Sequence, residues 1–460
     1  MSTAIANVEQ YLESFVAVEK LSKGEPGWLQ TMRKNAFARF CETGFPTTHD
    51  EDWRFTNVAA IARTPFSVAG PERSQVSTSD LKAWEIEGSA ARLVFVDGWF
   101  AAALSSVGPL PAGVVVSSLR KEIEKNSGML ERHFGRYLDI ERDPFSALNA
   151  AFAQDGAFVH VSKGVSLEKP VHVLYVSTER QAPTMTNPRN LVIVEQEAEA
   201  TLIEEYVSLS DGAVLCNSAT ELIAGESATA SHYMIEREHR EAFNISTLRI
   251  QQDRSANVAS HSLLLGGGLV RNNVHPVLAG EGGECLINGL FVGSGKQHLD
   301  NYMYVEHASP HCSSRQFYNG ILDQQAHGVF HGRIVVHKDA QKTDAKQTNR
   351  NLLLSDDAQI DTKPQLEIYA DDVKCTHGAT IGQMEENALF YLQSRGIDAR
   401  SARRLLLLAF ASECLGRMKA GLARTHAERL IEGHLLSVGN PAPLAGTDAS
   451  PVERSWEEVG

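Results

Sequence analysis

A thiol and an imidazole stand two positions apart in the segment DDVKCTHGATIG, residues 371–382, where Cys375 and His377 form a Cys-x-His pair. In an extended strand, residues i and i+2 point to the same face, so both side chains would project in one row with Asp371 and Val373. A thiolate and an imidazole placed in this way can bind the same metal ion. The pair therefore indicates half of a metal site.

The same two residues also allow simpler interpretations. Cys375 could be a thiol packed in the core, and His377 could cap a following helix or hydrogen-bond a backbone carbonyl. Cysteine-protease chemistry is disfavoured, because it needs a base from elsewhere in the fold and often a helix N-terminus beneath the sulfur. Two ligands complete neither a tetrahedral metal site nor an iron-sulfur cluster, which usually take four. The missing ligands would have to come from the rest of the chain or from a second protein.

Histidines in EHASPHCSSRQF and AHGVFHGRIVVHK could supply such ligands within the chain. His327 and His331 would share one strand face if their segment is extended. A histidine-rich strand is more often a hydrogen-bonded face than a ligand set, so this internal site is the alternative to a site shared between two proteins. The candidates are His307, His311, Cys312, His327, His331 and His337.

Length and composition exclude several classes of function. The chain has 460 residues, 43% apolar and 22% charged, as in ordinary globular proteins. Its formal net charge of -14 argues against general binding to nucleic acid or to an anionic membrane. No apolar run approaches the roughly 18 residues of a membrane span, and no signal-peptide pattern opens the chain, so we expect a cytoplasmic protein. The six cysteines form no CxxC motif and should be free thiols.

Short β-rich runs dominate the chain from about residue 157 to residue 380. Small or polar turns recur before many of them, about 27 to 30 residues apart at first and about 14 to 17 apart later, and this repeat predicts a β-solenoid. The ends and edges of such a stack remain open to further pairing. A β-sandwich is the alternative, but the Gly-hairpin signals that it requires are irregular.

Helical patterns flank this region. Residues 8–45 have helical spacing, and helices are predicted again after Gly382, where Asp398 can cap the second of them. That helix is apolar on nearly all sides, which predicts either a bundle with segment 425–438 or a position in a partner's groove.

Two glycine-rich segments fail as nucleotide-binding motifs. In GLFVGSGKQ, residues 289–297, Leu290 stands where a P-loop has its first glycine and Gln297 where it has Ser or Thr. LLLGGGLVRNN lacks the strand-G-x-G-x-x-G-helix order of a dinucleotide fold. We expect no ATP binding by this route.

The segment SRQFYNGILDQQAHGVFHGRIVVHKDAQKTDAKQTNRNLLLSDDAQIDTKPQLEIYADDVKCTHGATIGQMEENALFYLQSRGID closely resembles the core of the SufB/SufD family of iron-sulfur cluster assembly proteins. PFSALNAAFAQDGAFVHVSKGVSLEKPVHVLYVS is similar to the entry into that core, so the likeness covers roughly residues 140–435. HDEDWRFTN and the Cys-x-His pair match the SufD branch, and SufB differs at the pair. Before about residue 100 the match is thin, and we assign no chemistry there.

The resemblance implies a fold and partners. The fold would be a right-handed parallel β-helix flanked by helical domains, within a SufB-SufC-SufD complex that assembles iron-sulfur clusters de novo. The β-helix would pair with that of SufB, the C-terminal helices would dock the ABC-type ATPase SufC, and a homodimer is possible when the chain is alone. The expected division is a mostly helical N-terminal domain (1–155), the β-helix (156–382), a C-terminal helical domain (383–440) and a disordered tail (441–460).

The resemblance also implies roles for the Cys-x-His pair. His377 would be a ligand of a transient iron-sulfur cluster shared with SufB, while Cys375 is the lesser candidate and could be structural. The chain itself would be a non-catalytic scaffold, since ATP hydrolysis belongs to SufC. The alternatives are a purely structural partner of the ATPase and a stand-alone β-helix enzyme acting on carbohydrate. The latter would need paired acids on one solenoid face, whereas Asp356 and Asp357 fall in a predicted turn.

Overall fold

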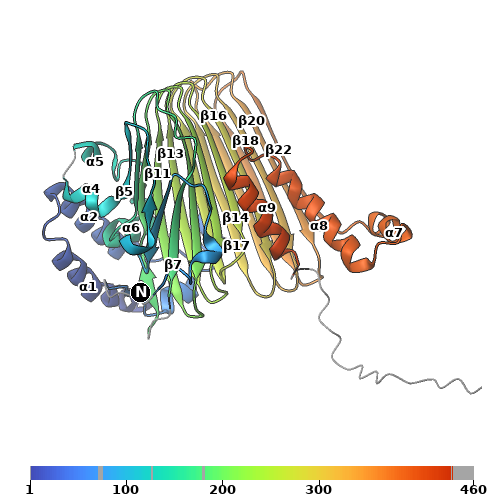
Figure 1. Cartoon of the computed structure of the whole chain (residues 1–460), viewed down its shortest axis with the longest axis horizontal. Coiled ribbons are helices and arrows are strands. Elements are labelled where there is room, and N and C mark those ends of the chain that lie inside the picture. The colour runs from blue at the N-terminus through green and yellow to red at the C-terminus, as the bar shows by residue number, and fades with distance from the viewer. Residues whose placement is uncertain (1, 71–75, 126–127, 179–181, 437, 439–460) are drawn as a thin grey trace, which may run out of the picture.

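Two stacked β-sheets form the centre of the molecule, and helices lie at both ends of the chain (Figure 1). The computed structural model describes residues 2–70, 76–125, 128–178, 182–436 and 438. Sheet A contains β1 (Ser67–Val68), β5 (Val114–Ser118), β6 (Ala157–Val161), β8 (Thr184–Thr186), β9 (Arg189–Val194), β11 (Val214–Ala224), β13 (Phe243–Gln252), β15 (Leu269–Leu278), β17 (His298–His307), β19 (His327–Val336) and β21 (Gln359–Ile368). Sheet B contains β2 (Ala91–Val96), β3 (Trp99–Phe100), β4 (Ser106–Val107), β7 (Val171–Ser177), β10 (Glu199–Ser208), β12 (Thr229–Arg237), β14 (Asn257–Leu264), β16 (Glu284–Gly293), β18 (Ser313–Leu322), β20 (Asp344–Leu353) and β22 (Lys374–Gln383).

From β9 onward the chain alternates between the sheets, and each strand pairs in parallel with the strand two places further on. The predicted parallel β-solenoid is therefore confirmed, with about seven turns. Its interior is a continuous hydrophobic core, in which Leu222, Ile250, Leu278 and Val305 of sheet A face the strands of sheet B. Alternation of inward apolar and outward polar residues explains why these segments form strands rather than helices.

The same turn recurs at the corner where the chain passes from sheet A to sheet B. One residue there adopts a left-handed backbone conformation in successive coils: Glu197, Ser227, Ser255, Gly282, His311 and Lys342. The first turns recognised in the sequence all lie at this corner, one coil apart. The later ones alternate between this corner and the opposite one, where Gln324 has a positive φ. This explains why the apparent repeat length is halved towards the C-terminus.

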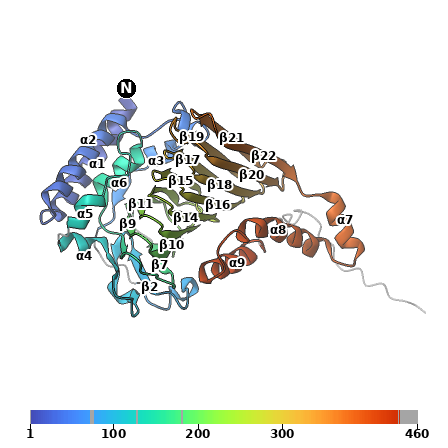
Figure 2. The same cartoon turned by 90° about the horizontal axis from the view of Figure 1, so that it is seen from above.

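The N-terminal helices cover the outer face of the first coils of sheet A (Figure 2). Phe145 and Phe152 pack there with Leu215 and Ile245. Strands of the same region extend both sheets, since β2 pairs with β7 in parallel, and β5 pairs antiparallel with β6. The helices are α1 (Ser2–Leu21), α2 (Gly27–Thr43), α3 (Ala59–Arg63), α4 (Leu119–Glu124), α5 (Gly128–His133) and α6 (Pro144–Phe152), with 3-10 turns at Glu51–Trp53, Lys82–Trp84 and Ala102–Leu104.

Three helices follow the solenoid: α7 (Glu386–Ser394), α8 (Ala399–Leu415) and α9 (Leu422–His434). Helices α8 and α9 lie on the outer face of sheet B, where Leu407 of α8 packs in one cluster with Leu290 and Phe317. Helix α8 packs in the same cluster with α9, as the bundle alternative expected, and the chain's own solenoid covers the rest of its apolar surface, which neither alternative included. Asp398 caps α8 as predicted, accepting a hydrogen bond from the Ser401 N–H at 3.0 Å.

Two further predictions concern the C-terminal tail and membrane-spanning helices. The tail predicted to be disordered, residues 441–460, lies outside the described residues. None of the helices in the described ranges is both long and apolar enough to cross a membrane.

Candidate functional site

Cys375 and His377 lie on β22, the last strand of sheet B. Cys375 is in register with Ala345 and His377 with Gln347, both of which are buried in the solenoid interior. The two side chains therefore project on the inner face of the last coil, side by side as the spacing predicted.

The two residues differ in exposure. Cys375 is half-buried and packs against the hydrophobic core, and burial raises the pKa of its thiol, with a smaller contribution from the charge of Asp344. His377 is exposed. Because a metal ion binds the thiolate and not the thiol, the imidazole is the more available ligand. The prediction that His377 caps a following helix is wrong, since α7 begins only at Glu386 and its N-cap is Glu385.

The strands that carry and face the pair form an open end of the solenoid (Figure 2). Among the described strands, β22 pairs only with β20, and β21 only with β19. Large apolar side chains are exposed at this end: Ile381 by 52%, Tyr369 by 63% and Ile368 by 40%. An unpaired edge with apolar groups beside it is a ready site for strand addition by another chain.

Gln347 lies directly behind His377 and was missed by the sequence analysis. Its Nε2 donates to Oε1 of Gln316 at 2.8 Å, whereas its own Oε1 is buried and has no hydrogen-bond partner. Gly332 leaves room for this side chain, since a Cβ there would come within 2.0 Å of Gln347 Nε2. Metal-binding histidines usually donate their second ring N–H to such an oxygen, which fixes the orientation of the ring. The register of neighbouring coils is the signal that would have identified Gln347.

The other candidate histidines lie elsewhere and have partners of their own. His327 and His331 do share the outer face of β19, as predicted, but His327 bonds His298 and Asp361, and His331 bonds Gln365. The hydrogen-bond distances are 3.2 Å from His327 to His298, 2.8 Å from His327 to Asp361, 2.9 Å from His331 to Gln365, 3.2 Å from His337 to Glu306 and 2.8 Å from His307 to Ser314.

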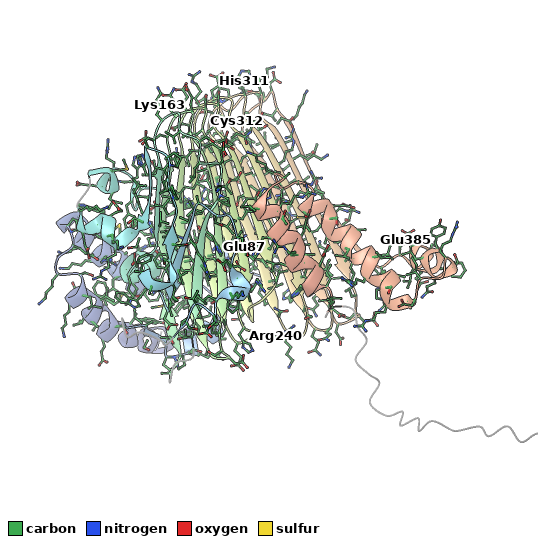
Figure 3. The ribbon with its side chains drawn as sticks, in the orientation of Figure 1. Glu87, Lys163, Arg240, His311, Cys312 and Glu385 are labelled. Atoms are coloured by element: carbon green, nitrogen blue, oxygen red, sulfur yellow. The ribbon has the colours of Figure 1, made fainter. Side chains whose placement is uncertain are left out.

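His311 and Cys312 occupy a solenoid corner, remote from the helices (Figure 3). His311 is exposed there, 4.0 Å from Glu281, and Cys312 is buried. Within the part of the chain that the structure describes, no three His, Cys, Asp or Glu side chains are grouped so that they could hold a metal ion. The open end thus presents a thiol and an imidazole as candidate ligands, without a complete set among the described residues.

Comparison with known proteins gives the family context of this site. Residues 175–410 match the family model described as SUF system FeS cluster assembly, SufBD core domain, and residues 5–173 match the SufBD protein N-terminal region. The iron-sulfur cluster assembly protein SufD of Escherichia coli is 33% identical over 81% of this chain and 85% of that protein. An iron-sulfur cluster assembly SufBD family protein of Synechocystis is 32% identical over 89% of this chain and 92% of its own length. The chloroplastic protein ABCI7 of Arabidopsis thaliana is 29% identical over 88% and 86%.

Proposed function

Because the chain belongs to the SufBD family of iron-sulfur cluster assembly proteins, we propose that it is the SufD-type subunit of a cytoplasmic SufB-SufC-SufD complex. In this proposal the chain is a non-catalytic scaffold, and its open end pairs with the β-helix of SufB. A transient iron-sulfur cluster is the cargo built between the two. When SufB is absent, the same edge can pair with a second copy of this chain.

One observation carries the proposal: an exposed imidazole lies on the inner face of β22, the last strand, whose second edge is paired by none of the described strands. His377 can bind iron through a ring nitrogen, Gln347 can orient the ring, and Cys375 can add a thiolate once a nearby iron ion lowers its pKa. A strand added at the edge of β22 would lie about 4.8 Å away, so its side chains could complete the ligand set.

The test is His377→Ala in the co-expressed complex. We expect the visible absorption of the cluster and the iron content to fall to the background level, while size-exclusion chromatography shows an intact complex. His311→Ala is the matched control, because His311 is also an exposed histidine of the solenoid but lies at a corner. Unchanged cluster content in the His377 variant would remove this residue from the mechanism.

The ATPase docking role falls to the C-terminal helices. Helix α7 stands away from the solenoid (Figure 2), and its Phe390 and Tyr391 are 72% and 56% exposed. Exposed aromatic residues on a projecting helix are typical of protein interfaces. Helix α8 joins this surface to the outer face of sheet B, so movement of a docked ATPase could reach the coils near the open end.

The second candidate is a purely structural partner of the ATPase, in which the exposed apolar end serves only for pairing. Replacement of Cys375 and His377 together separates the two functions, since the structural role predicts full cluster content in the double variant. A carbohydrate-active enzyme gains no support, because Asp356 and Asp357 lie exposed in the turn between β20 and β21.

A further inference from the structure

Three arginines occupy the first two turns of α8: Arg400, Arg403 and Arg404. They are unusual in a chain with a formal net charge of -14. Over the described residues none of the three has an acidic side chain within ion-pair distance, whereas other surface arginines, such as Arg350 with Glu413, do. The Nε atom of Arg404 is buried without a hydrogen-bond partner.

This arrangement opposes the stability of the helix that carries it. Arg400 is three and four positions before the other two arginines, so like charges are neighbours on the helix surface. Arg400 also lies in the first turn, at the positive end of the helix dipole, where acidic residues are preferred; that turn contains none, although the N-cap is Asp398. Asp398 caps this end of the helix, and Asp356 and Glu386 line the hollow beside Arg403, but within the described residues none of them forms an ion pair with the arginines. The three guanidinium groups therefore remain open to an anion from outside the described residues.

The arginines form one wall of a pocket of about 270 Å³. Its other wall is apolar and consists of Leu407, Leu435, Leu436 and Val438. Arg403 also lines a neighbouring hollow of about 250 Å³ between α7 and the end of β22. Next to the pocket on the chain, Leu405 is exposed, as are the aromatic side chains of α7. The site therefore combines strong positive charge with apolar surface.

We propose that this pocket binds an acidic segment of the ATPase subunit, an inference that rests on the docking role proposed above. Carboxylates of that segment would pair with the guanidinium groups, which suit bidentate hydrogen bonding, and an apolar side chain would fill the leucine-lined side. A nucleic acid or a free phosphate would leave the apolar wall unused. The arginines therefore select an acidic protein partner.

Charge reversal tests the pocket without endangering the fold. In the variant Arg400→Glu with Arg404→Glu, the acid at position 400 lies in the first turn, where the helix dipole favours it, and Glu has a helix propensity close to that of Arg, so the free chain should melt at an essentially unchanged temperature. Titration calorimetry with the ATPase subunit at about 50 mM salt should show affinity reduced about tenfold or more. Raising the salt to about 500 mM should weaken binding of the wild-type chain far more than binding of the variant.

Lys23→Glu with Lys163→Glu is the control, because it makes the same change in net charge at exposed positions remote from α8. This control should bind as the wild type does.

A dissociation constant within about twofold of wild type for the arginine variant would overturn the inference while leaving ATPase docking intact. Three other results would also overturn it. The first is arginine-dependent binding of inorganic phosphate that is tighter than binding of the ATPase subunit, and the second is the same result with a single-stranded oligonucleotide. The third is that the arginine substitutions no longer reduce ATPase affinity in a chain ending at Val438, which would make residues 439–460 the occupant. If the wild-type chain does not bind the ATPase at all, the docking role itself is refuted.

Discussion

Replacing Asn288 with alanine should loosen the attachment of α8 to the solenoid. Asn288 lies on β16 and is fully buried beneath the helix. Its amide nitrogen donates to the backbone carbonyl of Cys414 at 2.9 Å, and its amide oxygen accepts from the Cys414 thiol at 3.0 Å. The same nitrogen lies 3.1 Å from Nδ1 of His261. Alanine removes the two bonds to α8 and also the contact with His261, which lies on the neighbouring strand β14 of sheet B.

The expected loss follows from the groups that remain. The Cys414 carbonyl keeps a hydrogen bond from the Arg417 N–H at 3.1 Å. Losing its bond from Asn288 therefore lowers the free energy of unfolding by only about 1 kcal/mol. Nδ1 of His261 is left buried without the Asn288 partner; burial lowers the pKa of this imidazole to about 3, so the ring is neutral and needs a donor there. An orphaned buried acceptor costs about 1–2 kcal/mol, which gives a total of about 2–3 kcal/mol.

Denaturant unfolding followed by circular dichroism measures this loss, and hydrogen exchange of the α8 amides shows whether the helix opens first. Asn319→Ala is the matched control, because Asn319 makes a single bond to the helix, to the Phe410 carbonyl at 2.9 Å. It should cost about 1 kcal/mol. Equal losses in the two variants, or a loss below about 1 kcal/mol for Asn288→Ala, would refute this assignment of the anchor.

Three further predictions concern the site and the core. Gln347→Leu should lower cluster affinity about tenfold or more in the intact complex, measured by chelator competition, because the proposed imidazole ligand loses its orienting oxygen. Glu221→Gln should cost about 3–5 kcal/mol in denaturant unfolding, since it leaves Arg189 charged and fully buried; adding Arg189→Met should recover part of that loss. Burial lowers the pKa of His307 to about 4, below the ordinary 6.5. The unfolded chain therefore takes up this proton first, and stability is lost as the pH falls from about 6.5 towards 4. Between pH 8 and pH 5.5 the wild type should lose about 1.4 kcal/mol more than His307→Gln, and parallel pH profiles for the two would contradict this.

The solenoid could be predicted from the sequence because one coil is a local pattern that repeats. Small polar turns alternate with apolar-polar strands, and both features lie within a few residues of one another. The position of α8 could not be predicted in the same way. Its apolar surface indicated only that something covers it, and the cover is a set of outward residues such as Leu290 and Phe317 on strands far away in sequence. The extension of both sheets by β2 and β5 was hidden for the same reason.

For the candidate site, the two-residue period along a strand predicted which side chains share a face, whereas the number of residues per coil did not predict which residues of neighbouring strands are paired. The two-residue period placed Cys375 and His377 on one face, and the structure agrees. To pair Gln347 with His377 from the sequence, the number of residues in that coil must be known without error, because a shift of one residue moves a side chain to the opposite face of the sheet. The coils are not uniform, since paired residues are 29 positions apart in His298 with His327 but 30 in Gln347 with His377. Only the three-dimensional register resolves this difference.

The two ends of the solenoid differ in a way that connects pairing with chemistry. At the N-terminal end, β3 and β5 add antiparallel to β2 and β6, which stops the parallel stack. At the other end no described strand covers β22, although apolar side chains of the last coil remain exposed there. A strand that covers this edge removes those side chains from water and at the same time brings a residue within about 4.8 Å of His377. In the proposed complex, strand pairing and completion of the ligand set would therefore be a single event, and a partner that fails to pair would contribute no ligand to the cluster.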